Sequence, residues 1–439
     1  MNPETETQVL EPNREPSFYE GLLDCVHCGF CLDACPTYQE TGSEADSPRG
    51  RIYLMRALEE GRHALDRNAV WHLERCVGCQ ACEPACPSGV RYGRLIEVQR
   101  ERIRRSSRAE PRRKHLVNLL LWVLTSAKRA SLAMGSAGLV GRMTGAGNAV
   151  PALFTRFLGG TGPMTLHRPI SLKEKRLPYH TPAVGKRRAR VGFLSGCVMN
   201  ALYHDINEKT IAVLAANGIE VIVPRKAGCC GALHAHNGHV AQAARMAKRV
   251  IAAFEREDVD AVVLNSAGCG STMKEYGHLL ADDPAWAGRA RAFSRKVKDI
   301  TEFLDVMGLT QPLYPVRERI VYHDACHLAH AQGVRKPPRE ILRQVPGLEF
   351  APLNENELCC GSAGIYNFLE PELADRLQQR KIDNILAAGV QTVVTGNPGC
   401  LSWINDGLAR RGEKIETTHT VEVLFRSMTA IPPTQSGAE

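Results

Sequence analysis

The chain has 439 residues, 16 cysteines and a formal net charge of +8. Its length suggests roughly two to four domains, and cysteines spread through so long a chain exclude a small secreted scaffold held by disulfides. The stretch from Met1 to Glu20 is polar and acidic and lacks the apolar core of an export signal. We therefore expect the chain to work in a reducing compartment, where its cysteines bind metal.

Residues 1–15 are polar and contain two prolines, so we expect them to be disordered. Beyond them, the spacing C-x2-C-x2-C-x3-C-P occurs twice. The two runs are Cys25, Cys28, Cys31 and Cys35 before Pro36, and Cys76, Cys79, Cys82 and Cys86 before Pro87. Bacterial ferredoxins hold [4Fe–4S] clusters with this spacing. Zinc sites usually combine C-x2-C pairs across a longer loop, so zinc fits these runs badly, and so do disulfides.

In two-cluster ferredoxins, the fourth cysteine of each run binds the cluster of the other run. This rule assigns the first cluster to Cys25, Cys28, Cys31 and Cys86. It assigns the second cluster to Cys76, Cys79, Cys82 and Cys35. Such crossed ligation ties the two runs together and brings the clusters close enough for electron transfer.

The segments around the two runs have apolar residues at helical spacing. We expect helices at 18–23, 52–65, 69–75 and 92–105, and therefore a helical two-cluster ferredoxin-type domain over residues 16–110.

Residues 111–188 separate this domain from the second half. Eight basic residues lie between Arg100 and Lys114, and the apolar run LVNLLLWVLTSA follows at 116–127. A helix that spans a bilayer needs about 20 apolar residues, so this run is too short. We expect a helix over 114–134 that lies on a membrane surface, docks on an acidic partner or packs in the protein's own core. No aromatic pattern accompanies the charge, which argues against nucleic acid as a partner.

The second half contains one arrangement twice, in residues 189–310 and 311–432. Each copy begins with an apolar strand that leads to a cysteine, continues through a cysteine pair and a long helix, and ends with a strand that leads to a fourth cysteine. The two sets are Cys197, Cys229, Cys230 and Cys269, and Cys326, Cys359, Cys360 and Cys400. The repeated strand–helix–strand–helix–strand pattern predicts a duplicated α/β domain with its cysteines at strand ends, where such sheets bind ligands.

Each copy supplies enough thiols for one metal centre. Adjacent cysteines on a strand point to opposite faces, so such a pair reaches one metal only from a kinked turn, which Gly228 and Gly231 can form. We expect at least one further iron–sulfur centre here, with zinc or simply buried cysteines as alternatives. Neighbouring histidines could hydrogen-bond a cluster sulfur or carry protons, although surface or core histidines are the more ordinary interpretation. They are His234, His236, His239, His323, His327 and His330.

The local sequences resemble those of a known family. The Cys229–Cys230 and Cys359–Cys360 pairs, each with an upstream and a downstream cysteine, resemble the duplicated cysteine-rich CCG domain found in heterodisulfide reductase and in several respiratory iron–sulfur proteins. The supporting strings are Asp46-Ser-Pro-Arg-Gly-Arg-Ile52, Gly228-Cys-Cys-Gly-Ala-Leu-His234 and Cys360-Gly-Ser-Ala-Gly-Ile-Tyr-Asn367. With the ferredoxin-type domain in front, the chain resembles the iron–sulfur subunits of glycolate oxidase over about residues 15–428. The implied fold class is α+β, a helical ferredoxin module followed by a duplicated α/β CCG domain.

The resemblance implies an electron-transfer subunit of a membrane-associated glycolate oxidase, with no catalytic residue of its own. A flavin-containing hydroxy-acid oxidase subunit would oxidise glycolate to glyoxylate, and this chain would pass the electrons to a quinone or another membrane electron acceptor. The chain would be cytoplasmic and peripherally attached to the inner face of the cell membrane. Related subunits of lactate and anaerobic glycerol-3-phosphate dehydrogenases remain alternatives, as does a thiol–disulfide enzyme like heterodisulfide reductase.

One departure from the CCG pattern bears on these alternatives. The full domain in heterodisulfide reductase ends in C-x2-C and uses five cysteines for each noncubane cluster. Thr272 and Trp403 stand where the fifth cysteine would be. We therefore expect a four-ligand centre or a single occupied copy, and no disulfide-reducing chemistry.

Overall fold

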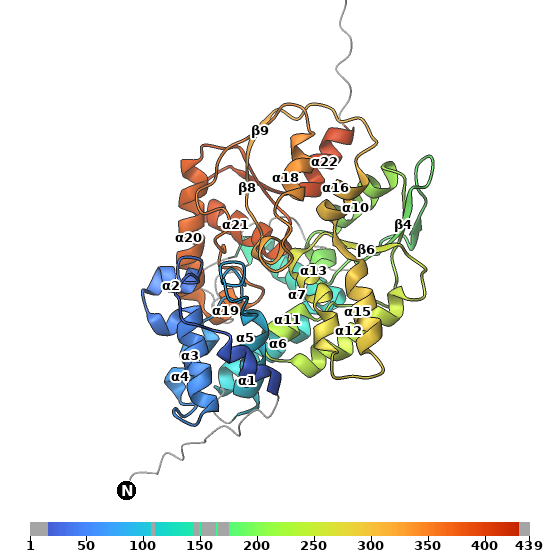
Figure 1. Ribbon diagram of the computed structural model, residues 1–439. Coiled ribbons are helices and arrows are strands. Elements are labelled where there is room, and N and C mark those ends of the chain that lie inside the picture. The colour runs from blue at the N-terminus through green and yellow to red at the C-terminus, as the bar shows by residue number, and fades with distance from the viewer. Residues whose placement is uncertain (1–15, 107–109, 144–148, 151–163, 166–174, 430–439) are drawn as a thin grey trace, which may run out of the picture.

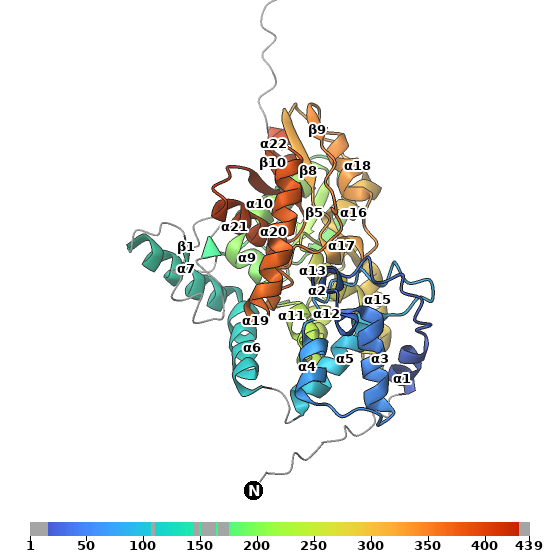
Figure 2. The same cartoon turned by 90° about the vertical axis from the view of Figure 1, so that its left-hand side faces the viewer.

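The computed structural model describes residues 16–106, 110–143, 149–150, 164–165 and 175–429. The disorder expected for residues 1–15 lies outside this range. Figures 1 and 2 show a group of N-terminal helices packed beneath a larger part that contains both sheets.

Both ferredoxin-type cysteine runs lie among the N-terminal helices (Figure 1). These are α1 (Pro16–Leu23), α2 (Pro36–Thr41), α3 (Pro48–Glu59), α4 (Arg67–Glu74) and α5 (Tyr92–Arg105), with a 3-10 turn at Glu44–Asp46. Helix α3 begins earlier than the sequence predicts because Ser47 caps it, accepting a hydrogen bond from the amide of Gly50 at 2.9 Å. Leu65, the last residue of the predicted helix, lies beyond its end but is buried in the same core as Met55.

Two helices lead from this domain toward the second half, α6 (Pro111–Leu124) and α7 (Ala127–Met143). The sequence predicted one helix over 114–134, and this prediction was wrong at its centre. Ser126 interrupts the helix because its hydroxyl accepts a hydrogen bond from the amide of Arg129, which starts a new helix. Two short antiparallel strands follow, β1 (Ala149–Val150) and β2 (Met164–Thr165). Over the described part of the chain, none of the helices has the length and apolar character needed to cross a bilayer.

The first cysteine-rich repeat is a five-stranded sheet with the order β3-β5-β4-β6-β7. Its strands are β3 (His180–Thr181), β4 (Ala189–Phe193), β5 (Ile219–Ile222), β6 (Ala261–Leu264) and β7 (Val297–Asp299). All neighbours are parallel except β3, which pairs antiparallel with β5 at the edge. The helices are α9 (Val198–Leu202), α10 (His204–Ala216), α11 (Ala232–His236), α12 (Val240–Phe254), α13 (Ala267–Lys274), α14 (Tyr276–Leu279), α15 (Ala287–Lys296) and α16 (Ile300–Met307).

The second repeat is a four-stranded parallel sheet with the order β11-β10-β8-β9. Its strands are β8 (Glu318–Tyr322), β9 (Leu348–Phe350), β10 (Thr392–Thr395) and β11 (Glu416–His419). Its helices are α17 (Cys326–Ala329), α18 (Pro337–Arg343), α19 (Tyr366–Leu369), α20 (Pro371–Ala387), α21 (Pro398–Arg410) and α22 (Thr420–Thr429).

Both repeats therefore have four parallel strands in the same spatial order, second-first-third-fourth, where the sequence predicted three strands. The fourth strands, β7 and β11, escaped prediction because they are short and carry polar residues, as the sequences VKD and ETTH show. Both lead directly into the last helix of their repeat, α16 or α22.

The two repeats pack against each other in a symmetric manner. Helix α10 of the first repeat contacts α22 of the second, and α18 of the second contacts α16 of the first. One hydrophobic core runs across the contact and contains Val191 and Phe193 from β4 together with Ile320 and Val394 from the second sheet. Because α10 corresponds to α18 and α16 to α22, the contact has pseudo-twofold symmetry, and it fixes the cysteine sets of the two repeats relative to each other.

Candidate metal centres

The two ferredoxin-type loops have the same backbone conformation. The second and fourth residues after the first cysteine have positive φ angles in both loops, at His27 (55°) and Gly29 (90°) and at Gly78 (73°) and Gln80 (59°). A positive φ is unusual for His27 and Gln80, and strained residues of this kind gather at functional sites. Two loops with the same thiol spacing and matching positive φ angles are expected to hold the same kind of cluster.

The structure brings the fourth cysteine of each run to the other run. Cys86 lines a small pocket together with the first three thiols of the first run, with Ile52 and Tyr92 in its wall. The shared thiols are Cys25, Cys28 and Cys31, and Cys82 of the second run also borders the pocket. Cys35 lies close enough to Cys79 and Cys82 to act on both thiols electrostatically. Cys35 also acts electrostatically on Cys31 of its own run, so the crossed ligand sets stay a prediction.

The two sets differ in burial. Cys28 is exposed, whereas Cys35, Cys76, Cys79 and Cys82 are all buried. Burial raises the pKa of Cys31 to about 11 and raises the pKa values of Cys79 and Cys82 well above their ordinary value. Thiolates in such places need a compensating positive charge, which cluster iron supplies.

Cys76 is an exception within the buried set. Burial works to raise its pKa, but the positive charges of Arg51 and Arg100 outweigh this effect and hold the pKa below its ordinary value. The amide of Gly78 also donates a hydrogen bond to Cys76 Sγ at 3.3 Å. The surrounding protein therefore already favours the thiolate form of Cys76, which is the form that binds metal.

The spacing of the sulfur atoms argues against a single zinc ion in the ferredoxin-type domain. A tetrahedral zinc site with Zn–S bonds of about 2.3 Å needs thiols that stand roughly 4 Å apart. Over the described residues, one group alone brings three metal-binding atoms within 4.8 Å of one another, and it lies in the second repeat. Among the described residues, the thiols of the ferredoxin-type domain form no group as close as this.

In the cysteine-rich repeats, the thiols follow the carboxyl ends of parallel strands. Cys197 follows β4 and Cys269 lies in the first turn of α13, just after β6. These two strands are neighbours, and the order of strands reverses between them, which is the place where open α/β sheets bind ligands. The corresponding thiols of the second repeat, Cys326 and Cys400, follow β8 and β10 in the same way.

The thiols of each set lie in contact with one another. In the first repeat the sulfur atoms of Cys197 and Cys229 are 3.4 Å apart, and Cys230 interacts with both Cys229 and Cys269. In the second repeat, Cys359 interacts with Cys326 and Cys360, and Cys360 also interacts with Cys400.

The two cysteine pairs also accept the same backbone hydrogen bond. The amides of Gly231 and Gly361 donate to Cys229 Sγ at 3.5 Å and to Cys359 Sγ at 3.4 Å. Both glycines have φ near 90°, and the expected kink after each cysteine pair is therefore present in both repeats.

Hydrogen bonds between thiols split the pKa values within each set. The thiols of Cys197 and Cys230 support Cys229 by hydrogen bonding, which places the pKa of Cys229 well below its ordinary value. Cys359 and Cys400 lower the pKa of Cys360 in the same manner, with a further contribution from His323. Each set therefore contains a thiol that readily becomes a thiolate, as a metal ligand must.

His323 distinguishes the second repeat from the first. One of its ring nitrogens lies within 4.8 Å of the sulfur atoms of Cys360 and Cys400, and all three side chains are buried. Leu194 occupies the equivalent position, three residues before the first cysteine, in the first repeat. The sequence favoured an ordinary surface or core histidine at this position; the signal that could have revealed its place is this difference between the two copies.

The other histidines lie at various distances from the thiols. His327 Nδ1 is 3.3 Å from Cys326 Sγ, and its ring is 5.0 Å from that of His236. His236 Nδ1 is 2.6 Å from the carboxylate of Glu97. His330 contacts the carbonyl oxygen of Glu357 at 3.0 Å, as expected of a structural histidine. Burial lowers the pKa values of His234 and His239, that of His239 to about 4.

A cavity of about 270 Å³ lies between both cysteine-rich thiol sets and Cys76 of the ferredoxin-type domain. Both cysteine-rich sets line it, and so do Cys76 and Gly78 of the ferredoxin-type domain. Val117 and Leu124 of α6 close it from another side. Thr272 does not line this cavity, whereas Trp403 does. The two repeats therefore do not form separate, distant sites, because both face one space that reaches the buried ferredoxin-type thiols.

Comparisons with known proteins agree with this architecture. A family model described as a 4Fe-4S dicluster domain matches residues 21–90, and a cysteine-rich domain model matches residues 191–274 and 320–405. These matches show the predicted α+β architecture and iron–sulfur clusters as its cofactors.

Two curated relatives cover nearly the whole chain. A probable glycolate oxidase iron–sulfur subunit of Bacillus subtilis is 36% identical over 97% of this chain and 99% of its own length. The glycolate oxidase iron–sulfur subunit of Escherichia coli is 31% identical over 93% of this chain and 94% of its own. Lactate utilization protein A of Exiguobacterium is 31% identical over 52% of this chain and 94% of its own.

A solved structure of a hypothetical protein from Helicobacter pylori has a similar fold. Its TM-score is 0.58 at 8% identity, over 95% of this chain and 75% of that one.

Proposed function

The chain belongs to the family of glycolate oxidase iron–sulfur subunits, and from this membership we propose that it carries electrons from glycolate oxidation to a quinone-type acceptor. A flavin-containing partner subunit oxidises glycolate to glyoxylate and retains the electron pair. The clusters supply one-electron transfer. This chain holds them with its thiolates, excludes water from one of them and docks on the partner.

We propose the crossed ligand sets as the two [4Fe–4S] sites. The exposed site uses Cys25, Cys28, Cys31 and Cys86, and the buried site uses Cys76, Cys79, Cys82 and Cys35. The grouping of these thiols around two places supports the assignment. A further centre is proposed for each cysteine-rich set, which lines the cavity beside Cys76. The proposed domain limits are 16–110, 111–188, 189–310 and 311–432.

The observation that carries the proposal is that a thiol of the ferredoxin-type domain packs in one cluster with the thiols of the second cysteine-rich repeat. Val77, Cys79 and Ala81 pack into one hydrophobic cluster with the four thiols of the second repeat. Cys79 also lies close enough to Cys326 for their charges to interact. An electron on the buried site therefore has a short route through packed protein to the cysteine-rich repeats.

Lactate is the second candidate substrate of the partner, because lactate utilization proteins resemble about half of this chain. A glycerol-3-phosphate dehydrogenase would use the same architecture. A disulfide-reducing role is disfavoured, because Thr272 and Trp403 replace the fifth cysteines. Assays of the purified complex with glycolate, lactate and glycerol 3-phosphate distinguish the substrates.

We also propose that α6 and α7 rest on the surface of an anionic membrane. The two helices contain no acidic residue and carry exposed basic side chains, among them Arg112, Lys114 and Lys128. They also carry four exposed large apolar side chains, Leu119, Trp122, Leu132 and Leu139. Figure 2 shows both helices at the edge of the molecule, with α7 extending away from it. Basic and apolar side chains together are what a helix on an anionic membrane requires.

The proposed function is tested with the complex of this chain and its flavin-containing partner. We expect Cys31→Ser to reduce electron transfer from glycolate to a soluble quinone analogue about a hundredfold or more, because one iron loses its thiolate. The partner should still co-purify with the variant.

Asp33→Ser is the matched control, since this exposed side chain lies in the same loop and binds no cluster. The control should keep full activity. Full acceptor activity of Cys31→Ser would contradict the proposed site.

A further inference from the structure

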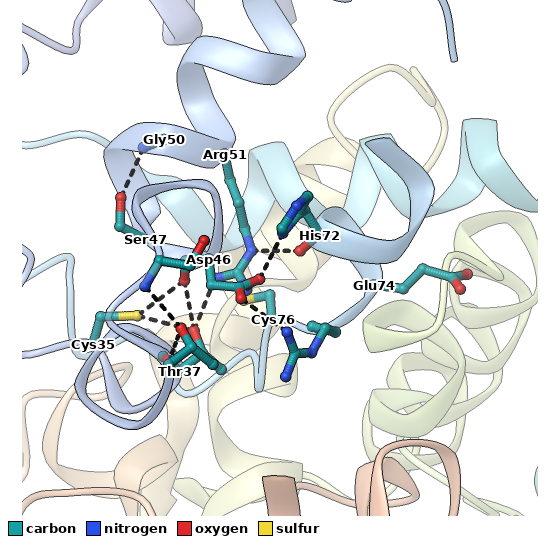
Figure 3. A network of polar contacts seen from close by, with 12 residues as sticks. Cys35, Thr37, Asp46, Ser47, Gly50, Arg51, His72, Glu74 and Cys76 are labelled. Atoms are coloured by element: carbon teal, nitrogen blue, oxygen red, sulfur yellow. Dashed lines mark hydrogen bonds and ion pairs between the residues drawn. The ribbon is translucent and has the colours of Figure 1, made fainter. Parts of the chain in front are cut away.

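A network of buried charges surrounds the thiols of the proposed buried cluster. Its centre is Arg51 in α3, which is 1% exposed, and its partner Asp46, also 1% exposed. Arg51 Nη2 lies 3.4 Å from Asp46 Oδ1, and Arg51 Nε donates to the carbonyl oxygen of His72 at 2.7 Å. Asp46 also contacts Arg75 Nη1 at 2.9 Å and His72 Nδ1 at 3.0 Å. Figure 3 shows these side chains converging between α3 and α4.

The network reaches the sulfur atoms of two proposed ligands. Arg51 Nη1 donates to Thr37 Oγ1 at 3.0 Å, and this hydroxyl lies 3.2 Å from Cys35 Sγ. Cys76 lies on the other side of the network in Figure 3, close enough to Arg51 for their charges to interact. Arg51 thus lies next to one ligand from each cysteine run.

The segment Asp46-Ser-Pro-Arg-Gly-Arg51, which the electron-transfer function leaves unexplained, builds this network. Ser47 caps α3 and Pro48 occupies its first position, which turns the helix start toward Asp46. A side chain at Gly50 would collide with the backbone carbonyl of Glu44. The residue types in this segment are therefore those needed to place Arg51 beside Asp46 between the two cysteine runs.

The positive charges around the buried thiols outnumber the negative ones. Glu83, which acts on Cys82, is paired with Arg91 at 3.6 Å, and Glu74, which acts on Arg100, is paired with Arg113 at 2.8 Å. Arg51 and Arg75 share the single carboxylate of Asp46. Arg100 adds a further positive charge, and its guanidinium donates to the backbone carbonyls of Glu74, Cys76 and His236 rather than to a carboxylate.

The surroundings of the exposed thiols differ. Arg49 lies nearby and donates to the carbonyl oxygen of His27 at 3.1 Å. Its charge is compensated by Glu44, whose two carboxylate oxygens lie 2.7 and 3.2 Å from the guanidinium. The pair is partly exposed to solvent, which weakens its field further.

Reduction of a cluster adds one negative charge to a group that is already anionic. Nearby charges therefore change how readily the cluster accepts an electron. Burial makes such a charge less favourable, so a buried cluster without nearby cations accepts an electron poorly. A buried cation acts in the opposite direction, and its effect is largest where water is excluded.

We propose that Arg51, held in place by Asp46, raises the reduction potential of the buried cluster, so that this cluster accepts electrons from the exposed one. The inference rests on the proposed ligand sets. In the transfer, the exposed cluster, reduced beforehand by the partner's flavin, loses one electron and the buried cluster gains it, with no bond broken and no proton moved. Arg51 is a positioning residue that acts through the field at the cluster.

The test is a redox titration of the full chain with both clusters, followed by EPR. In Arg51→Gln, we expect the equilibrium constant for reducing one cluster to fall about tenfold, which is about 59 mV for a one-electron couple. In Asp46→Asn, the same cluster should shift in the opposite direction, because a negative charge is removed and Arg51 is less compensated. Arg51→Lys keeps the charge and should lie close to the wild type. Arg49→Gln is the matched control and should leave the buried cluster unchanged.

Opposite shifts in Arg51→Gln and Asp46→Asn support the inference, because a loss of packing alone would move both variants in the same direction. Shifts of the same sign, or no shift in either variant, overturn it. If Arg51→Gln fails to retain its cluster, Asp46→Asn decides: a raised potential supports the inference, and an unchanged or lowered one overturns it. A wild-type chain without two [4Fe–4S] clusters would instead refute the proposed ligand sets, while two intact clusters with unresponsive potentials would refute only the role of Arg51.

Discussion

Cys35 and Cys86 are the residues on which the pairing of the two cysteine runs depends. Each follows three thiols of its own run and also lies near thiols of the other run, Cys86 with Cys25 in one pocket and Cys35 near Cys82. We expect Cys86→Ser to change the same EPR signal as Cys25→Ser, because both thiols hold the exposed cluster. Cys35→Ser should change the signal that Cys79→Ser changes. EPR of the four reduced variants measures this.

The reverse pairing of signals would contradict crossed ligation. In that case Cys35→Ser would alter the same EPR signal as Cys25→Ser, and each run would hold its own cluster. Thr37→Val serves as a control for disturbance near Cys35, because it removes a hydroxyl 3.2 Å from the sulfur without removing a ligand.

The sequence predicted the thiols of the proposed sites because their spacing is local. It could not predict the partners that come from distant segments. His323 joins Cys360 and Cys400 only after β8 and β10 pair, and the one sequence signal of this is that Leu194 stands at the equivalent position of the first copy. Arg51 was visible within the motif Asp46-Ser-Pro-Arg-Gly-Arg51, but its burial beside Thr37 and Cys35 is a tertiary property.

At the scale of elements, long amphipathic helices were predictable and short or capped ones were less so. Helix α5 has the predicted limits, and α20 (Pro371–Ala387) is the long helix expected in the second repeat. Side-chain caps shifted or divided others: Ser47 starts α3 early, and Ser126 separates α6 from α7. The fourth strand of each repeat is stabilised by its place at a sheet edge next to β6 or β10, which no local pattern reveals.

The helices α6 and α7 give a prediction at this scale. The full chain should bind mixed phosphatidylcholine–phosphatidylglycerol vesicles more tightly than pure phosphatidylcholine vesicles, and added salt should weaken the binding. Trp122, which is 59% exposed, should contribute through its apolar ring. We expect Trp122→Ser to weaken binding about tenfold, since burying one large apolar side chain is worth about 1.5–3 kcal/mol. Vesicle flotation measures the effect.

Val306→Ser is the matched control, because Val306 on α16 is 81% exposed and lies outside both helices. It should bind vesicles like the wild type. Equal binding of the wild type to neutral and anionic vesicles, or an equal loss in both variants, would contradict a membrane contact through α6 and α7.

For the whole molecule, the main feature that the sequence could not supply is the shared cavity. The repeated arrangement of strands, helices and cysteines predicted two cysteine-rich copies, and both exist as sheets of the same strand order. Their relative placement depends on the packing of α10 on α22 and α16 on α18, and on one core that spans both sheets. As a result, both cysteine sets face one space of about 270 Å³ that Cys76 also borders.

The burial of the thiol sets suggests the order in which electrons pass through the molecule. Cys28 of one set is exposed to solvent, the thiols of the other set are buried, and Cys76 of the buried set lines the cavity. We expect electrons to enter at the exposed cluster and to leave through the cysteine-rich repeats.

The most direct test is EPR of the complex after anaerobic addition of glycolate, without any added acceptor. We expect the signals of reduced [4Fe–4S] clusters to appear in the wild type, and to be lost or altered in Cys31→Ser while glyoxylate still forms at the flavin. Glycolate turnover to a quinone at full rate while the clusters of this chain stay oxidised throughout, or in a preparation that contains no iron, would contradict electron transfer through this chain.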